Sequence, residues 1–166
     1  MTEIRRTAIL AIDYGTVRIG LALADIETAL PRPVATIERV NRNEDMRRLR
    51  EFAREHAVKE IVIGLPLRLD GTRGDMAEEA TRFGERVRKQ LGLPVEMVDE
   101  RLTSWEAERL LEDQQGKVFH NDTTPAHVHS NMRKKKQADR ATVDAMAAAV
   151  ILKEYLARKQ NPGGSI

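Results

Sequence analysis

Residues 8–25 read AILAIDYGTVRIGLALAD, and this stretch decides the fold. The apolar run at its start predicts a buried strand over Thr7–Asp13, with Asp13 as its last residue. Tyr14–Thr16 predicts a turn, and apolar residues at every second position of Arg18–Asp25 predict an antiparallel return strand. We therefore expect the chain to open with a β-hairpin whose turn directly follows an acidic residue.

The rest of the chain predicts strands that alternate with helices. Further strands are expected at about Val34–Glu38, Glu60–Gly64 and Val95–Val98, and helices at Asn43–His56, from an N-cap at Asp75 to a stop at Gly92, from Thr103 to Leu111, and from about Asp139 to Lys159. Gly116–Arg133 lacks periodicity, and an irregular stretch of that length is usually functional or disordered. A meander followed by strand–helix crossovers predicts an α/β protein with a mixed five-stranded sheet and helices on both faces, as in the ribonuclease H-like fold.

Composition and charge limit the classes of protein that the chain can belong to. The 166 residues predict one domain over residues 1–160, with a flexible tail over 161–166. The net charge is only +2, but basic residues gather locally, which favours binding to a polyanion. The chain has no cysteine, which excludes disulfides and Cys-ligated zinc. No stretch predicts a membrane span or a signal peptide, so we expect a cytoplasmic protein with no membrane partner.

Three carboxylates lie where the local pattern predicts apolar or structural residues. Asp13 ends the first strand, Glu100 follows the last strand, and Asp144 lies on the apolar stripe of the final helix. A buried carboxylate usually acquires a partner or a metal ion, and an all-oxygen site suits Mg²⁺ or Mn²⁺. If the three converge, the sequence predicts a metal site for phosphoryl chemistry.

Each carboxylate also has a structural interpretation. Asp13 could form a turn, and Glu100 could pair with Arg101 or cap the next helix. Asp144 would lie just past the first helical turn if Asp139 were the N-cap, where the helix dipole weakly favours an anion. The convergence of three acids favours metal ligation over these single explanations.

Four motifs in order resemble the YqgF/RuvX family. They are Asp13-Tyr14-Gly15-Thr16-Val17-Arg18-Ile19-Gly20-Leu21-Ala22, Ile61-Val62-Ile63-Gly64-Leu65-Pro66-Leu67 with Asp70-Gly71, Asp99-Glu100-Arg101-Leu102-Thr103-Ser104, and Asp144-Ala145-Met146-Ala147-Ala148. The resemblance covers residues 9–156. It implies a metal-dependent nuclease, similar in fold to Holliday-junction resolvases, that helps to mature the end of precursor 16S ribosomal RNA. It assigns Asp13, Glu100 and Asp144 as catalytic metal ligands.

The same resemblance and the local charge indicate where nucleic acid would bind. Candidate contacts are Thr16, Arg18, Arg101, Thr103, Lys134, Lys135 and Lys136. The two arginines are equally compatible with pairing to nearby carboxylates. The expected partner is precursor ribosomal RNA, free or on the ribosome, and the expected assembly is a monomer or weak homodimer. A junction-DNA resolvase and a non-catalytic nucleic-acid-binding protein are the alternatives.

Overall fold

The computed structural model describes residues 6–68, 70–100 and 129–162, with the backbone alone for 129–139. Its elements are β1 (Ala8–Tyr14), β2 (Arg18–Asp25), β3 (Arg32–Glu38), α1 (Arg42–Glu55), β4 (Val58–Leu65), α2 (Asp75–Leu91), β5 (Val95–Asp99) and α4 (His129–Gln160). The strands form one sheet in the order β3-β2-β1-β4-β5. Strand β2 pairs antiparallel with both β1 and β3, whereas β4 pairs parallel with β1 and β5 pairs parallel with β4. The predicted meander with crossovers is confirmed.

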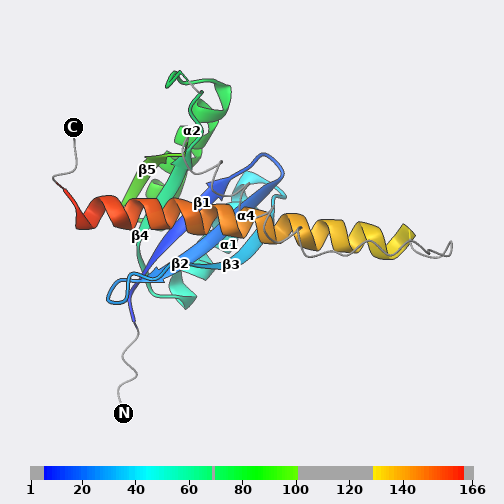
Figure 1. Ribbon diagram of the computed structural model, residues 1–166, viewed down its shortest axis with the longest axis horizontal. Helices are drawn as coiled ribbons and strands as arrows, with labels where there is room; N and C mark the ends of the chain where they lie inside the picture. Colours follow the sequence, from blue (N-terminus) through cyan, green and yellow to red (C-terminus); the bar gives the residue numbers. More distant parts are fainter. Residues whose placement is uncertain (1–5, 69, 101–128, 163–166) are drawn as a thin grey trace, which may run out of the picture.

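Helices cover both faces of the sheet (Figure 1). On one face, alternate residues of the strands form a core with α1 and α2, in which Leu10, Ile12 and Phe83 are fully buried. On the other face, α4 runs across β1, β2 and β3, and its Ile151 and Leu152 pack on the alternate set. Because successive strand residues point to opposite faces, the two cores share the same strands and both helical layers are needed.

The last helix is longer than the sequence predicts. It begins at His129, not at Asp139, so the predicted irregular stretch Gly116–Arg133 is helical over its final residues. Asp139 is therefore not the N-cap, and Asp144 lies about four turns into the helix. The helix dipole acts within the first turn and does not explain a carboxylate there. The predicted helix Thr103–Leu111 lies outside the described residues.

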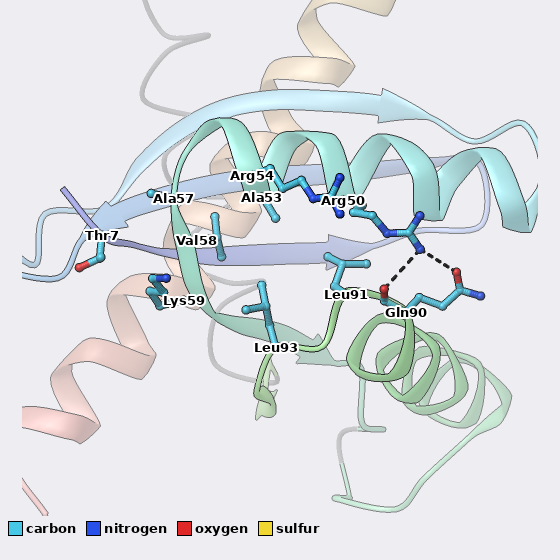
Figure 2. A pocket seen from close by; sticks show the side chains of 10 residues that line it. All are labelled: Thr7, Arg50, Ala53, Arg54, Ala57, Val58, Lys59, Gln90, Leu91 and Leu93. Carbon is cyan, nitrogen blue, oxygen red and sulfur yellow. Dashed lines mark hydrogen bonds between the residues drawn. The ribbon is translucent and has the colours of Figure 1, made fainter. Parts of the chain in front are cut away.

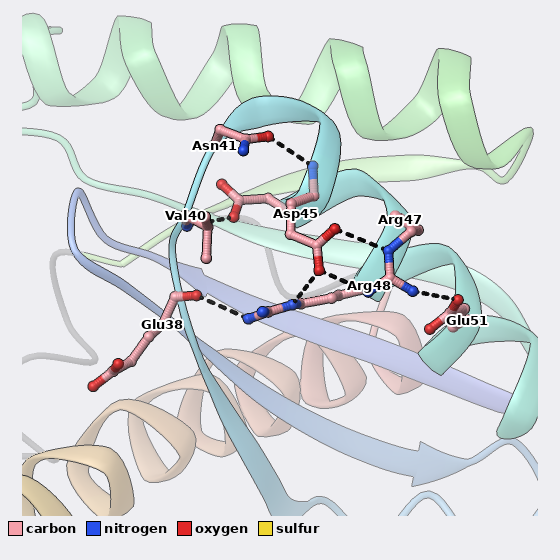
Figure 3. A network of polar contacts seen from close by, with 8 residues as sticks. Glu38, Val40, Asn41, Asp45, Arg47, Arg48 and Glu51 are labelled. Atoms are coloured by element: carbon pink, nitrogen blue, oxygen red, sulfur yellow. Dashed lines mark hydrogen bonds and ion pairs between the residues drawn. The ribbon is translucent and has the colours of Figure 1, made fainter.

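Capping residues account for most of the remaining boundaries. The Asn41 side chain accepts a hydrogen bond from the backbone nitrogen of Glu44 and begins α1 (Figure 3). Gly92 ends α2 in the left-handed conformation, as predicted. Asp75, however, is the first residue of α2 and not its cap, which is Gly74. Strand β3 lies at the sheet edge, as predicted from Pro31, which precedes it, and Pro33, which is its second residue.

Within the described residues, no helix combines the length and the apolar character needed to cross a membrane.

Candidate active site

Asp13 lies near the end of the central strand β1, on the face that α4 covers. Ile9 and Ala11 belong to the core beneath α4, and the alternation of a strand places Asp13 on the same face. Gly20 is its partner on β2, and Gly64 follows the last paired position on β4. The strands on either side of Asp13 thus each present a position without a side chain, which lets other parts of the chain approach the strands there.

Gly20 allows α4 to approach the sheet closely enough to bring Asp144 beside Asp13. An added Cβ at Gly20 would overlap the carbonyl oxygen of Asp144 and lie 2.9 Å from the nitrogen of Ala145. Because glycine has no Cβ, the helix backbone can rest directly on β2.

Gly64 makes room for Glu100. An added Cβ there would overlap Oε1 of Glu100 and lie 2.7 Å from Cδ1 of Ile151 on α4. The backbone nitrogen of Glu100 donates to the carbonyl oxygen of Leu65 over 3.3 Å, which keeps the chain close to β4 after β5 ends. The side chain of Glu100 therefore lies between the sheet and α4, on the same face as Asp13.

The pKa values of Asp13 and Glu100 are shifted in part by the charges of neighbouring carboxylates. Burial, and to a smaller extent the charge of Asp144, raises the pKa of Asp13 to about 7. Burial also raises the pKa of Glu100 to about 7, with contributions from the charges of Asp13 and Asp99. The structure thus brings together the three carboxylates singled out from the sequence. Both raised values show that negative charge is unfavourable here without a cation.

Arg18 at the start of β2 pairs with one member of this acidic cluster, defined as Asp13, Glu100 and Asp144. Its Nε donates to Oδ2 of Asp144 at 2.6 Å, and both side chains are partly exposed. The structure therefore shows the carboxylate pairing that the sequence left open. A phosphate contact by Arg18 stays a prediction.

The turn after Asp13 is held from the opposite face by Arg39. Its Nη1 donates to the hydroxyl of Tyr14 at 3.0 Å and to the carbonyl oxygen of Gly15 at 3.2 Å. Its Nε donates to Oδ2 of Asp45, a side chain only 1% exposed, at 3.0 Å. Burial opposes the charge of Arg39, but the hydrogen bonds to Asp45 and Tyr14 outweigh it and leave its pKa raised. This network fixes the backbone next to Asp13.

The acidic cluster fits a divalent cation in donor chemistry. Carboxylate oxygens are the ligands that Mg²⁺ and Mn²⁺ prefer, and a cation would offset the unfavourable burial of Asp13 and Glu100. The coordination shell is not preformed, because no three His, Cys, Asp or Glu residues in the described ranges are arranged to hold one ion. Asp144 is instead engaged with Arg18.

The other predicted contacts are placed only in part. Thr16 is exposed in the turn after β1. Lys134, Lys135 and Lys136 lie in the N-terminal part of α4, where the backbone alone is described. Arg101 and Thr103 lie outside the described residues.

Sequence reasoning missed the structural roles of Gly20, Gly64 and Arg39. The two glycines had a detectable signal, since each interrupts a strand at an inward-facing position, where glycine indicates close approach of another group. Arg39 follows the edge strand and had no comparable signal.

The sheet order, the crossing α4 and the acidic residues at the end of the central strand define a protein of the ribonuclease H-like class. Among solved structures, the RuvC protein of Thermus thermophilus with a Holliday junction substrate has a TM-score of 0.53 over 92% of this chain and 96% of its own, at 12% identity. The Thermus thermophilus RuvC structure gives a TM-score of 0.50 at 13% identity, with the same coverage. At this identity the likeness establishes the fold.

Sequence comparison gives the family. The family described as "RuvX: Holliday junction resolvase" matches residues 7–158. A curated protein from Anaeromyxobacter sp. (strain K), named "Putative pre-16S rRNA nuclease", is 41% identical over 90% of this chain and 96% of its own. One of the same name from Chloroflexus aurantiacus is 35% identical over 95% and 92%. The chain belongs to the RuvX family.

Proposed function

We propose that this protein is a cytoplasmic, metal-dependent nuclease that hydrolyses phosphodiester bonds in RNA and matures the end of precursor 16S ribosomal RNA. The observation that carries the proposal is that Asp144 and Glu100 lie close enough to Asp13 to interact with it electrostatically, an approach that Gly20 and Gly64 allow because they lack side chains. The nuclease name of relatives that match at least 90% of the chain supports the RNA substrate.

The roles of the residues follow from their chemistry. Asp13, Glu100 and Asp144 would hold Mg²⁺ or Mn²⁺, which when bound supplies an activated water and neutralises charge on the phosphate. A carboxylic acid must lose its proton to act as a ligand, and the pKa values near 7 of Asp13 and Glu100 place that loss at neutral pH. Arg18, beside Asp144, is positioned to exchange its carboxylate partner for a substrate phosphate.

A cleavage assay tests this function. Precursor 16S ribosomal RNA, a four-way DNA junction and plain single strands are incubated in parallel with Mn²⁺, Mg²⁺ or EDTA. We expect cleavage of the precursor RNA with either metal, none with EDTA, and a loss of at least about a hundredfold in Asp13→Asn. Asp25→Asn, a matched change at the end of β2, should keep wild-type activity.

The family description favours one second candidate, a resolvase that cuts DNA junctions. Cleavage of the junction with no cleavage of the precursor RNA would establish it in place of the first proposal. Binding of RNA with no cleavage under any metal condition would instead indicate a non-catalytic binding protein.

A further inference from the structure

A second candidate ligand site lies at the end of the sheet remote from the acidic cluster. A pocket of about 550 Å³ opens between the last turns of α1, the end of α2 and the start of β4 (Figure 2). Its volume is within the range of about 300–1,000 Å³ that small-molecule sites occupy.

The pocket is basic. Arg50 and Arg54 from α1 and Lys59 from β4 line it, and none of its lining residues is acidic. Neither Arg54 nor Lys59 pairs with a carboxylate in the described part of the chain. Arg50 uses Nη2 to contact the carbonyl oxygen and Oε1 of Gln90, at 3.3 and 3.1 Å. Its contact with Gln90 fixes the guanidinium at the pocket without neutralising its charge.

A neighbouring pocket differs, because it is lined by both basic and acidic residues. That pocket, of about 620 Å³, is lined by Arg6 and Arg32 but also by the carboxylates Asp25 and Glu55. Its cations therefore have acidic neighbours, whereas the cations that line the first pocket have no carboxylate beside them in its lining.

Two backbone irregularities direct side chains into the basic pocket. Ala57 has a φ of 50°, a left-handed conformation that is unfavourable for a residue with a Cβ and is usually filled by glycine after a helix. Successive residues of β1 then pair with Val58 and Glu60, which leaves Lys59 as the extra residue of a β-bulge. Bulges re-aim side chains, and here Val58 and Lys59 both line the pocket. Such local strain is commonly retained where it serves a ligand.

The floor of the pocket is apolar. Val58 is buried, and Leu91 and Leu93 are partly buried against the same core. In Figure 2, Leu91 and Leu93 lie below the arginines of α1. Cations at the rim suit a phosphate, and an apolar floor suits the flat face of a base. We propose that this pocket binds a nucleotide, with its phosphate on Arg54 and Lys59 and its base on Leu91 and Leu93.

This ligand would not be the phosphodiester at the acidic cluster. The pocket is lined by Thr7, which comes six residues before Asp13, or about 20 Å of extended chain. Its floor also belongs to the core under α1 and α2, whereas Asp13 faces α4. The nucleotide is thus either free in solution or the terminal residue of an RNA chain, and the two sources share the same phosphate and base.

Calorimetry on the full chain in EDTA tests the proposal, with adenosine and guanosine 5′-monophosphate, the corresponding nucleosides, inorganic phosphate, and short RNA with or without a 5′-phosphate. We expect the monophosphates to bind, and nucleosides and inorganic phosphate to bind at least about tenfold more weakly. Arg54→Gln with Lys59→Gln should weaken monophosphate binding at least about tenfold. Arg42→Gln, at the other end of the same helix, is the matched control and should change it less than about twofold.

The outcomes separate this site from the nuclease. Asp13→Asn should bind the monophosphates like wild type, so loss of cleavage leaves the pocket proposal standing. Preference for 5′-phosphorylated RNA over the free nucleotide identifies a chain end as the source, and the reverse preference identifies a free nucleotide. Absence of monophosphate binding, equal binding of inorganic phosphate, or undiminished binding in the double variant with an unchanged melting temperature would overturn the proposal.

Discussion

At the residue scale, the acidic cluster stores unfavourable electrostatic energy in the folded chain. Asp13 and Glu100 are partly buried, and Asp144 and Glu100 can approach Asp13 because Gly20 and Gly64 have no side chains. The free-energy cost of burying these charges arises from a few side chains, so single substitutions should change the measured free energy of unfolding.

The stability of the metal-free protein should depend on the protonation of Asp13. Its pKa is raised from 3.8 to about 7 by folding, so the folded state binds more protons between those values and stability falls as pH rises through that window. Asp13→Asn should remove the penalty and exceed wild-type stability by roughly 2 to 4 kcal/mol at pH 8, with little difference at pH 4. Urea unfolding in EDTA at both pH values measures this, and equal stability at pH 8 would contradict it.

The two glycines should respond differently to the same added methyl group. At Gly20 the methyl overlaps the α4 backbone, so Gly20→Ala should destabilise the fold by roughly 3 kcal/mol or more. At Gly64 it overlaps the end of the Glu100 side chain and approaches Ile151, so Gly64→Ala should cost less stability but most of the activity. Gly84→Ala, whose methyl would lie 3.0 Å from Sδ of Met97 on the other face, is the control. Melting and cleavage measured together test the distinction, which fails if Gly64→Ala retains full activity.

At the element scale, the junction between β3 and α1 holds the turn that carries the site. Asp45 accepts a hydrogen bond from Nε of Arg39 and another from the backbone nitrogen of Val40. Figure 3 shows Val40 and Asp45 beside the exposed pairs of α1. Asp45→Ala leaves the Arg39 charge partly buried without its partner and should cost roughly 3 kcal/mol. Glu51→Ala removes only the exposed pair with Arg47 and should cost less than about 1 kcal/mol. Equal losses of unfolding free energy in Asp45→Ala and Glu51→Ala would contradict this prediction.

The strands and the end of α2 were predictable because their signals are local, whereas the N-caps predicted at Asp75 and Asp139 were wrong. Apolar alternation predicted β2 over Arg18–Asp25, and Gly92 predicted the end of α2. The start of α4 was not predictable from apolar periodicity, because residues 129–138 carry few apolar side chains. That stretch contains lysine, arginine, methionine and glutamine, which favour helix by intrinsic propensity, so propensity would have extended the prediction toward His129.

The acidic cluster was predictable because each carboxylate contradicts an apolar pattern. The pairing of Arg18 with Asp144 joins residues 126 positions apart. From the sequence, Arg18 was equally compatible with a phosphate contact and with a carboxylate pair. The roles of Gly20 and Gly64 depend on how closely α4 and Glu100 approach the strands. Tertiary packing determines how closely they approach, and the local sequence pattern does not predict that distance.

At the scale of the whole molecule, α4 connects distant parts of the chain. It packs on β1, β2, β3 and β4, and near its end the hydroxyl of Tyr155 donates to Glu60 while Lys159 pairs with the same carboxylate at 3.0 Å. Its N-terminal part extends beyond the strands (Figure 1). One helix therefore supplies a carboxylate to the acidic cluster and carries a basic run away from it.

That basic run should contribute to the binding of nucleic acid. Lys134, Lys135 and Lys136 precede Asp144 by eight to ten residues, about 12–15 Å along the helix. Changing all three to glutamine should weaken RNA binding at every sequence alike and reduce the salt slope by about one per lost phosphate contact. The same change at Arg86, Arg88 and Lys89 on α2 is the control. Titrations across salt concentrations measure the slopes, and an unchanged slope in the lysine variant would remove the run from the interface.

The position of Asp144 in the chain has a consequence for synthesis. Translation produces Asp13 and Glu100, together with all five strands of the described sheet, before it reaches α4 at residues 129–160. Until then the sheet face that holds Ile9, Ala11 and Val62 has no cover, and the acidic cluster lacks its third member. A ribosome-bound chain that ends before α4 therefore exposes this apolar face and holds only two of the three carboxylates of the acidic cluster.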